Sequence, residues 1–238
     1  MKCKVRWAKD RGKAEHGWLH ANFTFSFANY YDPEHCGFHS LVVMNNDIIE
    51  PGGGFPTHPH KDAEVFTYVI SGELEHRDSM GNGSVIRPGD LQYMSAGSGV
   101  THSEFNPSSE NRTELYQIWM TPSQAGGEPR YAEKKLAGSE KQEGWTLLFS
   151  RDGANDSTPI RQNAQFLFGK ASEGATLTIH PEAAFPHAWI QVVSGSLCID
   201  EHNLSRADGL SIEYLDEPIT LSIKQSCSLF LFRLPDIP

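Results

Sequence analysis

Residues 65–72 of the sequence read VFTYVISG, a run of six β-branched or aromatic residues followed by a Ser-Gly turn signal. Such side chains pack well on a pleated sheet, so the stretch predicts a short strand that ends at a turn. Gly and Pro supply 21 and 14 of the 238 residues, which indicates frequent turns, whereas helical periodicity is scarce. The sequence therefore predicts an all-β protein made of barrels or sandwiches. Similar runs between turn residues occur at 41–44, 115–120, 145–149, 175–179, 189–193, 219–223 and 228–232.

The end of this predicted strand has a second copy in the chain. Residues 69–74 read VISGEL and residues 192–197 read VVSGSL, and a Gly/Asp turn follows each copy at 88–90 and at 207–209. Equivalent placement in two strand-rich halves indicates an internal duplication.

A polar, breaker-rich stretch separates the two halves. Residues 121–144 contain a Gly-Gly pair, Pro129 and a run of charged residues, a composition typical of a linker. We therefore expect an N-terminal domain over residues 1–125, a linker over 126–144 and a C-terminal domain over 145–238.

Charge and composition exclude several classes of protein. Lys and Arg number 20 against 30 Asp and Glu, and the net charge of -10 has the wrong sign for a nucleic-acid footprint. No apolar run approaches the ~18 residues of a membrane helix, and the basic N-terminus lacks the apolar stretch of a secretory signal. The four cysteines form no C-x-x-C pair, which argues against disulfides and thiolate zinc sites. We expect a cytoplasmic protein with reduced thiols that binds neither nucleic acid directly nor membranes.

The segment between residues 52 and 106 carries the residue types of a metal site. His58 and His60 are two residues apart, as are His102 and Glu104, so each pair shares one face of a strand. Neighbouring strands inside a barrel would bring the four together, and imidazole and carboxylate groups suit divalent Fe, Cu, Ni or Zn. Such a set leaves coordination positions open for substrate, water or dioxygen. Glu64 has the parity of His58 and His60, so the residues alone leave it open as a ligand instead of Glu104 or as an orienting group.

The same segment carries a family resemblance. Residues 52–72 resemble the first cupin motif and residues 89–106 resemble the second, with Ser95 in place of the usual proline. Three strings that resemble pirin are THPH, MSAG and GVTHSE, at 57–60, 94–97 and 99–104. Two further strings resemble the bacterial pirin-like proteins with quercetinase activity, namely FSFANYYDP at 25–33 and LFRLP at 231–235. The resemblance thus extends over essentially the whole chain.

This resemblance implies a bicupin, an all-β chain of two jelly-roll β-barrels, each a cupin domain. It places the pirin metal ligands on His58, His60, His102 and Glu104, and it implies that Glu64 is not a primary ligand. It also implies one divalent transition metal, with Fe(II) favoured and Ni, Co, Mn, Cu or Zn as alternatives.

The second half lacks this constellation. Alignment of the two glycine turns puts Ala183, His187, Ser222 and Lys224 at the positions of His60, Glu64, His102 and Glu104. We therefore expect a structural C-terminal barrel without a metal site, and a structural or surface role for His187. The other histidines are expected to be solvated or hydrogen-bonded, namely His16, His20, His35, His39, His76, His180 and His202.

The resemblance implies first a metal-dependent dioxygenase that opens the central ring of flavonols such as quercetin with O2 and releases carbon monoxide. Glu104 would then be both a ligand and the general base for the flavonol 3-hydroxyl. Aromatic residues near the mouth of the barrel are expected to sandwich the planar polyphenol, with Phe23, Phe25, Phe55 and Tyr93 as candidates.

Two other functions stay open. The likeness to pirin also implies a non-enzymatic, metal- and redox-responsive regulator that binds a protein partner, which the acidic charge balance suits. A cupin isomerase acting on a sugar or an organic acid is the third, and it predicts activity without O2. Turnover separates the first two, because a catalyst consumes O2 with quercetin and a regulator only changes its partner affinity with the oxidation state of the metal.

Overall fold

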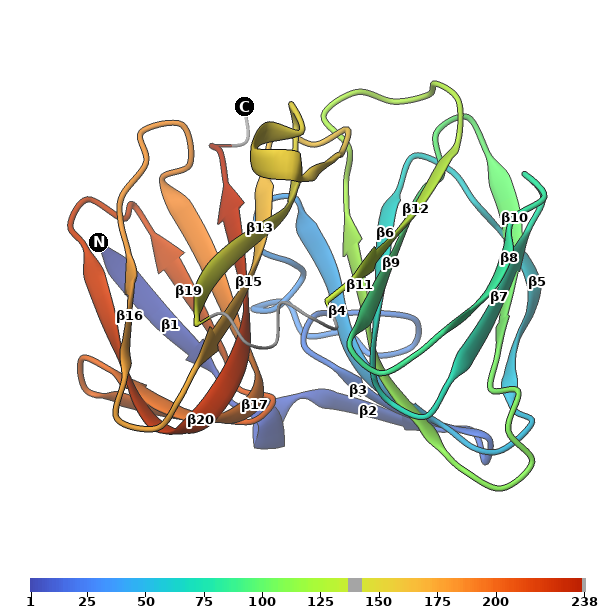
Figure 1. Cartoon of the computed structure of the whole chain (residues 1–238), viewed down its shortest axis with the longest axis horizontal. Coiled ribbons are helices and arrows are strands. Elements are labelled where there is room, and N and C mark those ends of the chain that lie inside the picture. The colour runs from blue at the N-terminus through green and yellow to red at the C-terminus, as the bar shows by residue number, and fades with distance from the viewer. Residues whose placement is uncertain (137–142, 237–238) are drawn as a thin grey trace. The chain divides into compact units, whose positions relative to one another are not determined.

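The computed structural model describes residues 1–136 and 143–236, and its strands confirm the all-β prediction (Figure 1). The chain divides into two compact units. Among the described residues, one unit holds 12–136 and the other holds 1–11 together with 143–236. No helix of the described residues is long and apolar enough to cross a membrane.

The unit of residues 12–136 is built from two antiparallel sheets that face each other, as Figure 1 shows for the green strands. The seven-stranded sheet has the order β12-β9-β6-β11-β4-β3-β2, and the four-stranded sheet has the order β5-β10-β7-β8. The strands are β2 (Gly12–Glu15), β3 (Leu19–Phe23), β4 (Leu41–Ile49), β5 (Gly54–His60), β6 (Glu64–Ser71), β7 (Leu74–Asp78), β8 (Gly83–Ile86), β9 (Asp90–Ser95), β10 (Val100–Phe105), β11 (Thr113–Met120) and β12 (Arg130–Lys135).

Alternation along the strands builds the apolar core of this unit. Leu19, Ala21 and Phe23 are buried on β3, while the residues between them are half-buried. These three pack with Val69 of β6 and Leu115 of β11 in one cluster. Burial of such side chains at roughly 25 cal/mol per Å² is the main stabilising term for the barrel, and it also fixes the strand register.

The second unit is organised around one sheet of nine strands, with β1-β19-β17-β20-β15-β13-β14 in order, β16 on β20 and β18 on β17. One part of its core is mainly aliphatic, and another is made of buried phenylalanines, namely Phe149, Phe166, Phe230 and Phe232. The elements are β1 (Lys2–Arg6), η1 (Ala8–Asp10), β13 (Gly144–Ser150), η3 (Ala154–Asp156), β14 (Thr158–Pro159), β15 (Gln165–Ala171), β16 (Thr176–Ile179), β17 (His187–Ile199), β18 (His202–Ser205), β19 (Gly209–Glu213) and β20 (Ile219–Leu234).

The repeated Ser-Gly motif has the same backbone conformation in both units. Gly72 and Gly195 each have φ of 77°, a region that favours glycine. A Cβ on Gly72 would overlap the carbonyl oxygen of Arg112, and one on Gly195 would overlap that of Ser226. Both turns therefore require glycine for conformation and for close approach to a neighbouring strand.

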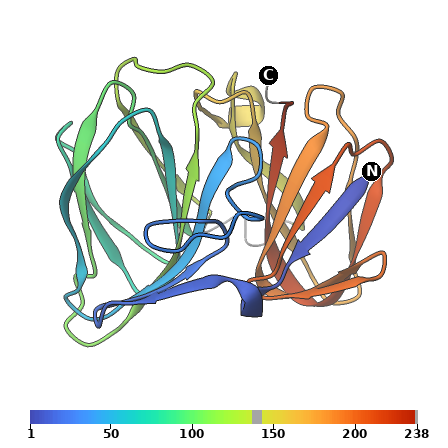
Figure 2. The ribbon, with the colours of Figure 1, turned by 180° about the vertical axis from the view of Figure 1, so that it is seen from behind.

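The boundaries of the two units differ from the expected 1–125, 126–144 and 145–238. Strand β1 pairs with β19 of the second unit, as Figure 2 shows for the blue strand, and not with the domain that follows it in sequence. Strand β12 lies inside the expected linker but pairs with β9 over six residues. Its charged sequence RYAEKK is suited to the edge of a sheet, where one side faces water. Residues 137–142 of the expected linker lie outside the described residues.

Candidate metal centre

Three histidine side chains of the four-stranded sheet converge. His58 and His60 lie on β5, and the strand register places His102 of β10 directly opposite His58. The ring centroids of His58 and His102 are 4.4 Å apart, and that of His60 is 4.8 Å from each. One nitrogen from each ring lies within 4.8 Å of the other two. The two-residue spacing in the sequence therefore does bring these three residues to one place.

The ring nitrogens are arranged in a way that fits a cation. Nδ1 of His58 lies 2.8 Å from the carbonyl oxygen of Pro56, which can only accept, so this nitrogen carries a proton and Nε2 is the nitrogen left to bind a metal. Nε2 of His102 is buried and has no hydrogen-bond partner among the residues that the structure describes. A buried polar atom without a partner is costly, and a first-row divalent metal would satisfy it.

Two of these rings are held in the form that binds metals. Burial, with the adjacent His58 and His76 rings, lowers the pKa of His102 to about 3. Burial, with His102 and His58, lowers the pKa of His60 to about 4. Both imidazoles are therefore neutral at pH 7.

Glu104 joins the group from β10, two residues beyond His102, and its buried carboxylate reaches the seven-stranded sheet. Nε2 of Gln117 donates a hydrogen bond of 2.9 Å to Oε2, and Oγ1 of Thr67 lies 3.2 Å from Oε1. Potential ligand atoms of Glu104, His102 and His76 lie within 4.8 Å of one another, in a second group that shares His102 with the first. The structure thus gathers all four predicted residues around His102.

A row of polar side chains faces this group from the seven-stranded sheet. Asn45, Gln117, Thr67 and Gln92 stand opposite one another on β4, β11, β6 and β9, so they share one face. Oγ1 of Thr67 lies 2.9 Å from Oε1 of Gln117, and both residues contact the carboxylate of Glu104. Sequence reasoning missed both, because a Thr and a Gln in strands have no distinguishing spacing.

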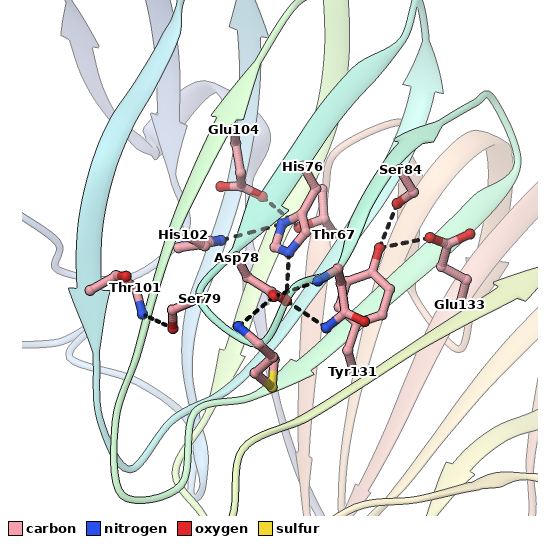
Figure 3. A network of polar contacts seen from close by, with 12 residues as sticks. Thr67, His76, Asp78, Ser79, Ser84, Thr101, His102, Glu104, Tyr131 and Glu133 are labelled. Carbon is pink, nitrogen blue, oxygen red and sulfur yellow. Dashed lines mark hydrogen bonds and ion pairs between the residues drawn. The ribbon is translucent and has the colours of Figure 1, made fainter.

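His76 is a further residue that sequence reasoning did not assign to the site. It was expected to be solvated or hydrogen-bonded, and it is fully buried on β7 with its Nδ1 3.4 Å from Nδ1 of His102 (Figure 3). Its Nε2 lies 3.2 Å from Oδ2 of Asp78. The signal was present, because His76-x-Asp78 repeats the spacing of His102-x-Glu104, and the register pairs His102 with Asp78 and Glu104 with His76.

Glu64 lies outside both groups of potential ligands. Its Oε2 accepts a hydrogen bond of 2.5 Å from the hydroxyl of Tyr93, and its Oε1 accepts one of 2.5 Å from Ser95. Glu64 is three residues from Thr67 on β6, so the two side chains point to opposite faces, and Thr67 is the one that contacts Glu104. This geometry agrees with the expectation that Glu64 is not a primary ligand.

An aromatic-lined cavity of about 530 Å³ lies next to Phe55, whose ring packs against His58. Phe23 and Phe55 line it, as expected, together with Trp18 and Phe27, which were not predicted. The ring of Phe55 is 4.9 Å from that of Trp18 and 6.2 Å from that of His58. The ring of Phe27, which also lines the cavity, lies 5.5 Å from that of Trp119. The Trp119 ring in turn lies 4.7 Å from that of His60.

The other two aromatic candidates were wrong. Phe25 is 2% exposed, follows the end of β3 and does not line the cavity. Tyr93 is 1% exposed and bonded to Glu64, because it lies on the face of β9 opposite to Gln92. Both are core residues.

In the second unit, His187 is a structural residue. It is buried, its Nε2 lies 2.8 Å from Oδ1 of Asp236, and its ring packs 4.8 Å from that of Tyr214. Within residues 143–236, no three side chains of the metal-ligating types come together.

Comparison with known proteins agrees with this architecture. The pirin family model matches residues 4–120, and the model of the quercetinase C-terminal cupin domain matches residues 147–234. A protein of Escherichia coli (strain K12) named quercetin 2,3-dioxygenase is 43% identical over 233 residues, 98% of this chain and 99% of that protein. The chain belongs to the pirin family. Its two units are the two cupin domains of a bicupin, as the sequence resemblance implied.

Other pirins are similar to this chain over nearly their whole length. The bacterial pirin YhhW from Escherichia coli, solved in complex with nickel(II), is 41% identical with a TM-score of 0.93, covering 99% of this chain and 100% of that one. A pirin-like protein of Caulobacter vibrioides is 37% identical over 226 residues, 92% of this chain and 94% of that protein.

Proposed function

We propose that this pirin is a metal-dependent dioxygenase that opens the central ring of flavonols such as quercetin with O2 and releases carbon monoxide. The observation that carries the proposal is the convergence of His58, His60 and His102 with the buried Glu104 beside an aromatic-lined cavity. The name of the Escherichia coli relative, quercetin 2,3-dioxygenase, supports the same substrate class.

His58, His60, His102 and Glu104 would hold one divalent metal. The neutral imidazoles, the buried Nε2 of His102 without a partner and the adjacent carboxylate fit such an ion. When bound, the metal would lower the pKa of the flavonol 3-hydroxyl and assist reaction with O2. We favour Fe(II) from the resemblance to pirin, and the nickel(II) complex of YhhW makes nickel the leading alternative.

Glu104 is the candidate general base. Its buried carboxylate lies in one group of potential ligands with His102, and the proton of the flavonol 3-hydroxyl would pass to one of its oxygens. Gln117 donates a hydrogen bond to one carboxylate oxygen, and the Thr67 hydroxyl, whose single proton is shared with Oε1 of Gln117, contacts the other. These contacts hold the orientation of the carboxylate before the substrate arrives.

The cavity is suited to a planar aromatic substrate. Trp18, Phe23, Phe27 and Phe55 offer ring faces and edges, and Asn45 and Asp47 add buried polar groups at its wall. Phe55 links the cavity to His58, so a ring seated against it lies close to the proposed metal.

Shortening Phe55 should weaken substrate binding more than the chemical step. In Phe55→Ala the KM for quercetin is expected to rise about two- to tenfold, since one aromatic contact is worth about 0.5–1.5 kcal/mol. The kcat is expected to change much less. Tyr31→Ala, at a residue that is 75% exposed, is the control and should leave both constants unchanged. A fall in kcat with an unchanged KM would argue against this substrate position.

The proposed function is tested by turnover. Protein loaded with Fe(II), or separately with Ni(II), is mixed with quercetin, and flavonol absorbance and dissolved O2 are followed together. We expect both to fall in parallel, and we expect neither to change after a chelator has removed the metal. Loaded protein that consumes neither quercetin nor O2 would favour the regulator, and conversion without O2 of a sugar or organic acid would favour the isomerase.

A further inference from the structure

A row of three buried side chains extends from the candidate metal centre into the four-stranded sheet. Figure 3 shows it running from His102 through His76 to Asp78. The ring nitrogens of His102 and His76 are 3.4 Å apart, and His76 is 3.2 Å from the carboxylate. The side chains of His76 and Asp78 are both fully buried.

The carboxylate of Asp78 accepts several hydrogen bonds. Oδ1 receives the backbone N–H groups of Met80 and Asn82 at 2.9 and 3.0 Å, and Oδ2 receives the Nδ2 amide of Asn82 at 2.9 Å. Burial would raise the pKa of Asp78, but these bonds and the one from His76 lower it below its usual range. Asp78 is therefore an ionised group that can only accept.

The carboxylate of Asp78 determines which ring nitrogens of His76 and His102 carry a proton. Because Asp78 only accepts, Nε2 of His76 carries a proton, and Nδ1 of His76 is the nitrogen that is left to accept. In this arrangement Nδ1 of His102 donates to Nδ1 of His76. The lone pair of His102 is left on Nε2, which is the buried atom that lacks a partner in the described part of the chain.

We propose that His76, oriented by Asp78, is a positioning residue that holds His102 in its Nδ1–H form, with the Nε2 lone pair presented to the metal. The proposal rests on the metal site of the proposed function. His76 would act on His102 as the Pro56 carbonyl acts on His58. Each is an acceptor that determines which ring nitrogen of the ligand is left for the metal.

The turn after β7 is hydrogen-bonded to β10, the strand that carries His102. Ser79 exchanges two hydrogen bonds with the backbone of Thr101, the neighbour of His102: its N–H donates to the carbonyl at 2.9 Å, and its hydroxyl accepts the amide of Thr101 at 3.1 Å. The turn that carries Met80 and Asn82 is thereby held beside β10, so Asp78 and His102 keep their separation.

A purely structural role for His76 makes a different prediction. Its ring stacks on Tyr131 with centroids 5.0 Å apart and planes at 28°, so it also fills space. His76→Phe keeps an aromatic ring but no acceptor, whereas His76→Gln keeps an acceptor oxygen but no ring. Positioning predicts that metal affinity falls most in His76→Phe, and packing predicts that it falls most in His76→Gln.

Affinity is measured for nickel(II) alone, by competition with a chelator. We expect binding about 10–100-fold weaker in His76→Phe, the usual cost of losing a group that orients a ligand, and less than tenfold weaker in His76→Gln. Glu133→Gln is the matched control, because Glu133 contacts Tyr131 in the same network and not His76, and it should bind nickel(II) like the unchanged protein. Equal affinities of the unchanged protein and His76→Phe would overturn the proposal.

A second measurement needs no bound metal, and its first step uses the unchanged protein. Nitrogen-15 NMR of the metal-free, unchanged protein at neutral pH distinguishes the two neutral forms of each histidine ring. We expect His102 as Nδ1–H and His76 as Nε2–H, with the His102 preference lost in His76→Phe and kept in His76→Gln. Finding His102 as Nε2–H in the unchanged protein would overturn the positioning role. A protein that shows the expected ring protonation but no quercetin turnover would overturn only the proposed function.

Discussion

Replacement of His102 by alanine is expected to abolish both metal retention and flavonol cleavage. His102 is central to the site, because it belongs to both groups of potential ligands and contacts His58, His60 and His76. Its loss removes the buried Nε2 and leaves two half-buried histidines and a carboxylate. We expect the metal content to fall from about one per chain to near zero after dialysis, and turnover to fall at least ~100-fold, equivalent to about 2.7 kcal/mol in the barrier.

The control for this variant is His20→Ala. His20 lies in the same unit, contacts Glu50 at 2.9 Å and takes no part in the site, so metal content and turnover should be unchanged. Circular dichroism of both variants checks that each is folded. A His102→Ala protein that keeps its metal and its full rate would contradict the assignment of the centre.

The second large effect is expected for Glu104→Gln. The amide keeps the size of the side chain but cannot take a proton, so kcat should fall by about 10²–10⁴, the range for loss of a general base. The KM for quercetin should change little, since the cavity is unaltered. Part of the rate should return as the pH is raised toward ionisation of the flavonol 3-hydroxyl itself, because a base is then no longer needed.

Glu64→Gln is the matched control for Glu104→Gln. Both carboxylates are buried in the same unit, but Glu64 bonds to Tyr93 and Ser95 on the other face of β6. We expect Glu64→Gln to lower the melting temperature and to leave kcat within about twofold of the unchanged protein. If the two variants exchanged these effects, Glu64 would be the base.

Strand positions and the histidine cluster could be predicted from the sequence because both depend on local patterns. The run at 65–70 became β6, and the two-residue spacing of His58 with His60 sufficed to put both rings on one face. The pairing of β1 with β19 could not be predicted, since it joins segments about 200 residues apart and Lys2–Arg6 has no distinguishing composition.

The surroundings of the site depend on strand register, which composition does not encode. Thr67 and Gln117 became partners of Glu104 only because β6 and β11 pair in one particular register. Phe23 and Phe25 look equivalent by alternation, but β3 ends at Phe23, and the alternation does not continue to Phe25. His76 is the exception, because its His-x-Asp spacing repeated a pattern already recognised as meaningful.

The most direct test of the proposed activity is the stoichiometry of gas exchange. Metal-loaded protein is incubated with quercetin in a closed vessel, and quercetin loss, O2 uptake and carbon monoxide release are measured in the same sample. We predict one O2 consumed and one carbon monoxide released for each quercetin lost, with no release from His102→Ala. Quercetin loss without carbon monoxide, or equal release from His102→Ala, would contradict ring opening at this metal centre.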